Sequence, residues 1–211
     1  MKKKVIILLS VLLLTGCTAV RINTKDIANT VNIILSKNNK IYNRVGKGYK
    51  YYVPRGLTYI DTNELNEKLY SNGNYYYLYI DAVSYYYKNK PKYKENKDAY
   101  YSKVFKVDNK QAYLEINKVD KKYLIKFEYN YARIESLVEK KDIEEVVMNS
   151  SYILSTVKFN NNVIKLMLDE NYFTNKNKKY NVFEKKNENK NSKFLKYNKK
   201  SSKKVKKDWG D

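Results

Sequence analysis

The chain of 211 residues contains no histidine and a single cysteine, Cys17. The absence of histidine excludes Ser-His-Asp and Cys-His nucleophiles and every histidine-bearing zinc site. One cysteine excludes an intrachain disulfide, a cysteine zinc site and an iron–sulfur cluster. The sequence also lacks a P-loop, a three-glycine dinucleotide fingerprint and an EF-hand loop. We therefore predict no metal site and no cofactor.

Carboxylates are the one remaining route to catalysis, and none of them forms a convincing pair in the sequence. The best candidates, Asp61 with Glu64 and Asp81, stand at predicted strand ends. Acids at such positions more often cap turns or face solvent than catalyse a reaction. We expect no catalytic residues and no enzymatic activity, and a carboxylate-based envelope hydrolase is the least favoured alternative.

The first seventeen residues have the organisation of a bacterial export signal. Three lysines at positions 2–4 precede an apolar run over 5–14 that only a serine interrupts. The run has about half the length of a membrane-spanning helix, which argues against an uncleaved transmembrane anchor. A buried core helix is a further alternative, but the lysines and the cysteine that flank the run do not fit it. The segment ends in Leu14, Thr15, Gly16 and Cys17.

These four residues resemble the lipobox of bacterial lipoproteins. The resemblance implies transfer of a diacylglyceryl group to the Cys17 sulfur, cleavage before Cys17, and a chain held by lipid on the extracytoplasmic face of the cell membrane. We therefore divide the chain into a signal peptide (1–16), a lipidated tether (17–22), a folded domain (23–173) and a tail (174–211).

The periodicity of the domain predicts an α+β fold. Apolar spacing predicts a helix over 24–37 and a second helix from Asp142, with a last short helix over 163–168. Strands are predicted in between, at 41–45, 49–53, 57–61, 65–70, 75–87, 100–107, 111–118 and 122–130. Residues 131–139 fit either a strand or a helix. Short connections make the sheet an antiparallel one, which we expect to be flanked by the N-terminal and the late helix.

Tyrosine is unusually frequent, with 24 residues, and gathers in the predicted strand 75–87. Alternation places Tyr76 and Leu78 on one face of this strand and Tyr75, Tyr77 and Tyr79 on the other. The second group is a candidate aromatic binding face for sugars or peptides. Packing inside the protein is the alternative for the same tyrosines.

The last 38 residues, 174–211, contain fourteen lysines and four acids and have few apolar residues, which predicts a disordered basic tail. A merely solvated terminus is one interpretation. Binding to anionic lipid or to a wall polymer is a second, as an electrostatic addition to the lipid anchor. Nucleic acid is a third, disfavoured by an extracytoplasmic location.

Two further segments carry a weaker resemblance. Residues 49–56, with the sequence Tyr-Lys-Tyr-Tyr-Val-Pro-Arg-Gly, and the helix that ends in Ile-Leu-Ser-Thr-Val-Lys-Phe at 153–159 are similar to the PsbP/Mog1/DcrB-like group. The resemblance implies a curved antiparallel sheet between helices. It also implies a lipid-anchored accessory or binding module, and it transfers no catalytic residues. We expect a non-enzymatic binding or scaffolding module of the cell envelope, with an envelope protein as partner. A solute-, glycan- or peptide-binding lipoprotein is the alternative.

Overall fold

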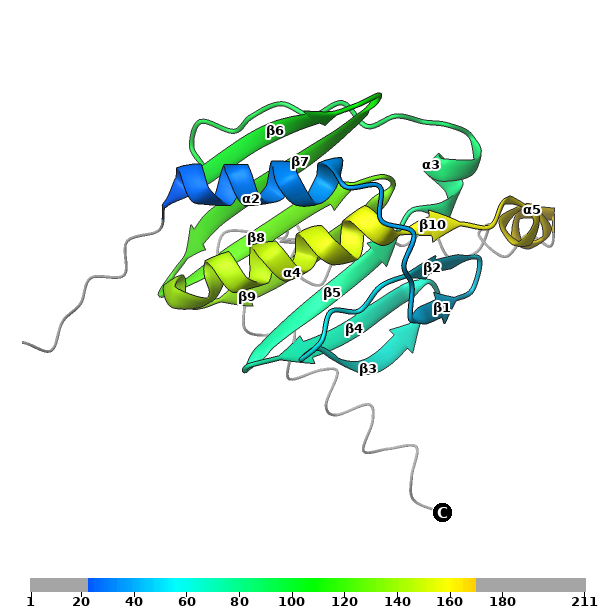
Figure 1. Ribbon diagram of the computed structural model, residues 1–211, viewed down its shortest axis with the longest axis horizontal. Helices are drawn as coiled ribbons and strands as arrows, with labels where there is room; N and C mark the ends of the chain where they lie inside the picture. Colours follow the sequence, from blue (N-terminus) through cyan, green and yellow to red (C-terminus); the bar gives the residue numbers. More distant parts are fainter. Residues whose placement is uncertain (1–22, 170–211) are drawn as a thin grey trace, which may run out of the picture. The chain divides into compact units, whose positions relative to one another are not determined.

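Seven antiparallel strands form the main sheet, in the order β3-β4-β5-β9-β8-β7-β6 (Figure 1). The computed structural model describes residues 23–169. The strands are β3 (Thr58–Asn63), β4 (Asn66–Ser71), β5 (Asn74–Ile80), β6 (Tyr101–Val107), β7 (Lys110–Val119), β8 (Lys122–Tyr129) and β9 (Ala132–Val138). The sheet consists of two meanders, β3-β4-β5 and β6-β7-β8-β9. They meet where β5 pairs with β9, with Leu78 opposite Ile134.

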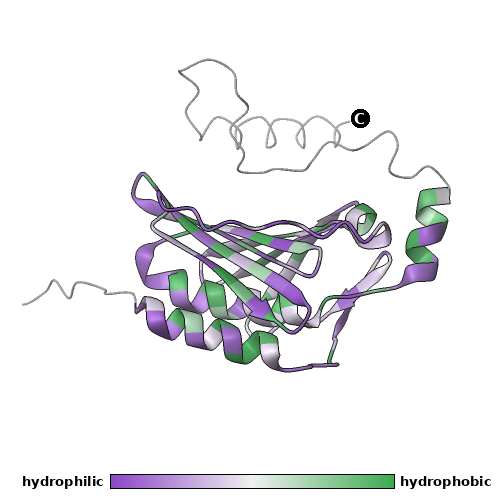
Figure 2. Cartoon of the chain, turned by 90° about the horizontal axis from the view of Figure 1, so that it is seen from above, coloured by the Kyte–Doolittle hydropathy of each residue, from purple (hydrophilic) through white to green (hydrophobic). Residues whose placement is uncertain are grey.

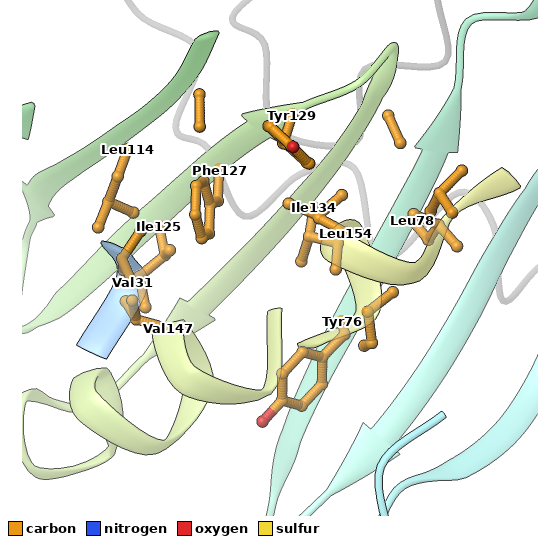
Figure 3. Packing of buried hydrophobic residues seen from close by; sticks show 14 of the residues in the cluster. Val31, Tyr76, Leu78, Leu114, Ile125, Phe127, Tyr129, Ile134, Val147 and Leu154 are labelled. Atoms are coloured by element: carbon orange, nitrogen blue, oxygen red, sulfur yellow. The ribbon is translucent and has the colours of Figure 1, made fainter. Parts of the chain in front are cut away.

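Two helices, α2 (Thr24–Ser36) and α4 (Ile143–Thr156), lie on the same face of this sheet (Figure 2). The helix α4 packs on β8 and β9, and α2 packs on α4 and β6. Between helices and sheet lies the apolar core, where Val31 and Val147 meet strand residues such as Ile125 (Figure 3). Successive residues of a strand point to opposite faces of the sheet, so every second strand residue points towards the helices and contributes to this core.

A second, three-stranded sheet consists of β1 (Arg44–Gly46), β2 (Tyr49–Tyr51) and β10 (Lys158–Phe159). It brings the segment after α2 together with the segment after α4. Two short helices lie near it: α3 (Ala82–Tyr86), which follows β5, and α5 (Asn161–Asp169), which packs against α3. A 3-10 turn, Lys140–Asp142, leads from β9 into α4.

The turn between β4 and β5 determines where β5, the most tyrosine-rich strand, begins. Asn72 and Gly73 both have positive φ, 47° and 81°, as a two-residue hairpin turn requires. The turn fixes the register that sets Tyr70 opposite Tyr75. Asn72 and Gly73 therefore form the hairpin turn that joins β4 to β5.

The predicted α+β class, with an antiparallel sheet, an N-terminal helix and a late helix, is confirmed. The ambiguous segment 131–139 contains the strand β9. One prediction is wrong: the strand that was expected over 75–87 ends at Ile80. Asp81 stops it, because its carboxylate accepts a hydrogen bond of 2.8 Å from the Ser84 amide and caps α3.

The predicted signal peptide (1–16), the tether (17–22) with Cys17, and the basic tail (174–211) lie outside the described residues. Within residues 23–169, no helix combines the length and the apolar character that crossing a membrane needs.

Candidate functional site on the outer face of the sheet

The outer face of the sheet, which points away from α2 and α4, carries polar side chains and tyrosines. Strand pairing sets these side chains in rows across the sheet. One row runs through paired residues of five strands: Lys68, Tyr77, Glu135, Lys126 and Glu115. Because directly paired residues in an antiparallel sheet point to the same face, cations and carboxylates alternate along this row.

The tyrosine patch, formed by Lys68, Tyr70, Tyr75 and Tyr77, lies at one end of this face. The ring centroids of Tyr70 and Tyr75 are 5.0 Å apart, and those of Tyr75 and Tyr77 are 6.4 Å apart. The Lys68 ammonium lies 4.2 Å from the Tyr75 ring centroid, which is a cation–π distance. Tyr75 is 43% exposed. The patch thus offers aromatic surface with a cation at its edge.

Of the three tyrosines expected on a binding face, the structure exposes Tyr75, half-buries Tyr77 and buries Tyr79. Tyr79 is only 7% exposed, and the guanidinium of Arg133 lies 4.5 Å from its ring centroid. The alternation that put Tyr79 on this face was right. Its side chain is nonetheless covered, so the accessible aromatic surface is the patch at the turn end of β5.

Ion pairs tie the charged residues of the outer face to one another. Arg133 Nε lies 3.1 Å from Glu135 Oε1, and Lys126 Nζ lies 3.1 Å from Glu128 Oε1. Both pairs keep part of their surface in contact with solvent, so each contributes modestly to stability. The two ion pairs place positive and negative charges side by side on this face, so neither sign of charge dominates there.

The segment 88–98 has no helix or strand and covers part of the outer face. The Tyr93 ring stacks on Tyr113 with centroids 5.4 Å apart and an angle of 12° between the planes. Burial, together with the carboxylate of Glu128, raises the pKa of the Tyr93 hydroxyl. Tyr93 therefore stays protonated and binds the loop to the sheet over β7 and β8.

A buried acid that the sequence analysis did not single out lies on the helix-covered face. Glu67 is 3% exposed and accepts hydrogen bonds from the hydroxyls of Tyr49, at 2.6 Å, and Tyr51, at 2.7 Å. Arg44 forms an ion pair with it. The signal was present in the sequence, because Glu67 alternates in phase with Leu65 and Leu69, both of which are buried.

Glu67 holds the small sheet against the main one, since Arg44 lies on β1 and both tyrosines lie on β2. Burial and the neighbouring Glu67 carboxylate raise the pKa of both tyrosine hydroxyls, which therefore remain donors at neutral pH. The carboxylate is fully occupied by protein donors. The cluster is a structural connection rather than an open reactive site.

The carboxylates that the sequence pointed to have local roles. Asp61 accepts a hydrogen bond of 2.7 Å from the Thr62 amide, and Asp81 caps α3. Glu64 lies in the β3–β4 turn with a positive φ of 60°. Within the described part of the chain, no three acidic or metal-binding side chains gather around a common point.

Comparisons with known proteins assign the chain to no protein family. No known protein family matches it, and no curated protein is significantly similar.

Proposed function

We propose that this protein is an extracytoplasmic lipoprotein, held on the cell membrane through Cys17, whose sheet domain binds or scaffolds a partner in the cell envelope. The observation that carries the proposal is the sequence Leu14-Thr15-Gly16-Cys17 after a lysine start and an apolar run. The proposal has three parts: the lipid anchor at Cys17, the location on the extracytoplasmic face of the membrane, and a role without enzymatic activity.

The short spacing between the lipobox and the domain supports a membrane-proximal module. Helix α2 begins at Thr24, and the Asn23 side chain caps it by accepting a hydrogen bond of 3.1 Å from the Lys25 amide. Asn23 follows Cys17 by six positions, and an extended chain over six residue steps reaches about 20 Å. The start of α2 would then stay close to the bilayer.

The tyrosine patch supports a binding role, and a glycan- or peptide-binding lipoprotein is the second candidate function. Tyr75 presents an exposed ring beside Lys68, and such a surface takes apolar and polar parts of a ligand together. On the same face, Arg133 pairs with Glu135 and Lys126 pairs with Glu128.

The test of the anchor is the intact mass and the membrane partitioning of the protein, compared with Cys17→Ala. We expect the wild-type chain to lose residues 1–16, to gain the mass of a diacylglyceryl group and to sediment with membranes. The variant should show none of these changes. A wild-type chain that keeps its N-terminus and carries no lipid would overturn the proposal.

A further inference from the structure

Three lysines converge at the end of the domain opposite the start of α2. Lys158 on β10 is the direct antiparallel partner of Lys50 on β2. Directly paired residues point to the same face of a sheet, with Cβ atoms about 5 Å apart. Tyr49 and Tyr51 point to the other face, where they contact Glu67. The two lysines therefore lie side by side on the outer surface of the small sheet.

The third member of this cation cluster is Lys110, the first residue of β7. Two residues further on, Ala112 pairs with Tyr129, and the adjacent Asn130 amide donates a hydrogen bond of 3.0 Å to the Val157 carbonyl, next to Lys158. Partial desolvation, in the first place, and the nearby charge of Lys158 lower the pKa of Lys110, while Asp108 acts in the opposite direction. Within residues 23–169, none of the three ammonium groups forms an ion pair with a carboxylate.

Aromatic rings support two of these lysines. The Lys50 ammonium lies 3.8 Å from the Tyr42 ring centroid, and that of Lys110 lies 5.7 Å from the Tyr129 centroid. Like charges placed directly opposite one another destabilise a sheet. A bound anion would offset that repulsion, and phosphate is a suitable anion because lysine binds it as a point charge.

The position of the cluster favours a polymer over a lipid headgroup. The first turns of α2 and α4 lie side by side, as Asp26 and Glu145 line a common groove (Figure 1). The strand β10 follows the far end of α4, about 21 Å along the helix axis. If Cys17 holds the start of α2 at the bilayer, which rests on the proposed function, the cluster lies at the end of the domain that is farther from the anchor.

We propose that Lys50, Lys110 and Lys158 form a binding site for the phosphodiester groups of an anionic polyol-phosphate polymer. Further lysines at this end extend the positive surface beyond a single phosphate, as a repeating polyanion requires. They are Lys47 in the β1–β2 turn, Lys88 after α3 and Lys165 on α5.

The test measures binding of the full chain to synthetic poly(glycerol phosphate) at several salt concentrations. The site variant carries Lys50→Gln, Lys110→Gln and Lys158→Gln. The control variant carries Lys118→Gln, Lys121→Gln and Lys122→Gln, three exposed lysines at the opposite end of the sheet. Both variants lose the same net charge and keep the basic tail, so the tail contributes equally to both.

We expect the site variant to bind more than about tenfold more weakly at low salt, and the control to stay within about threefold of wild type. The melting temperature of the site variant should be unchanged or raised, because it loses mutually repelling charges. Equal weakening in both variants, or no weakening in the site variant, would overturn the proposal.

Two further measurements are needed. The first distinguishes polymer phosphate from lipid phosphate as the ligand, and the second distinguishes the cation site from the proposed lipid anchor. Vesicles with phosphatidylglycerol should bind the site variant and the control equally well; a loss confined to the site variant, with polymer binding intact, would overturn the polymer assignment in favour of lipid. Cys17→Ala should keep polymer binding. Failure of lipidation would therefore disprove the anchor without affecting the site, and failure of polymer binding would leave the anchor untouched.

Discussion

The two faces of the main sheet are built from the same strands and have opposite characters. Along β5, Tyr76 and Leu78 are completely buried beneath the helices, whereas Tyr75 on the outer face is 43% exposed. Along β8, Ile125 and Phe127 are buried, while Lys126 and Glu128 pair on the outer face. The helix-covered face therefore carries the fold, and the outer face should tolerate substitution better.

The largest difference between the faces should appear when one aromatic residue is removed from the core. Phe127→Ala should lower the free energy of unfolding by about 3–5 kcal/mol, because it leaves a cavity between β8 and the helices. Leu124→Ala, on the outer face of the same strand, should cost less than half as much, since Leu124 is only half-buried. Urea unfolding measures both. Equal losses would contradict the division between the faces.

Glu67 is a buried carboxylate on the otherwise mainly apolar helix-covered face. Its replacement tests whether this carboxylate stabilises the fold. Glu67→Ala should cost about 3 kcal/mol, because the Tyr49 and Tyr51 hydroxyls and the Arg44 guanidinium lose their acceptor. The outer-face pair offers the control: Lys126→Ala should cost under about 1 kcal/mol. A Glu67→Ala protein as stable as wild type would show that the small sheet needs no polar connection.

The tyrosines beneath the helices should make the fold sensitive to alkali. Burial, above all, raises the pKa of Tyr76 to about 12, whereas an unfolded tyrosine titrates near 10. The folded state then binds the proton more tightly, so stability is complete below pH 10 and falls as the pH rises towards 12. For Tyr76 alone the loss at pH 11 is about 1 kcal/mol.

The raised pKa values of Tyr49 and Tyr51 extend the same effect to higher pH. Urea unfolding between pH 9 and pH 11 measures it. Tyr76→Phe should have a shallower decline over this range, although it also loses the hydrogen bond from the Asn149 amide. A variant whose stability declines as steeply as that of wild type would exclude Tyr76 as a source of the alkaline sensitivity.

Sequence alternation is sufficient to predict which strand residues face the helices, because period two is a property of the strand itself. It predicted Tyr76 and Leu78 on one side of β5 and Tyr75, Tyr77 and Tyr79 on the other. It could not predict that Tyr79 is covered, since Arg133 reaches it from a neighbouring strand. It also could not show that β5 stops at Ile80, because Asp81 fits a strand or a helix cap until the tertiary structure selects one.

The sites depended even more on contacts between segments distant in sequence. The Glu67 cluster joins β1 and β2 to β4, and the cation cluster joins β2, β7 and β10. Lys50, Lys110 and Lys158 are far apart in the chain, and no local spacing relates them. Only the pairing of β10 with β2 brings Lys158 next to Lys50.

The smallest effect on stability, and the sharpest test of the outer face, is expected at Tyr75. Tyr75→Ala should change the free energy of unfolding by no more than about 1 kcal/mol, because 43% of the residue is exposed. If the tyrosine patch binds a glycan or peptide, the same substitution should weaken capture of peptidoglycan fragments several-fold. Tyr123→Phe, a buried tyrosine outside the patch, is the matched control. Unchanged capture by Tyr75→Ala would leave the patch a packing feature and direct the search for a partner to the cation cluster.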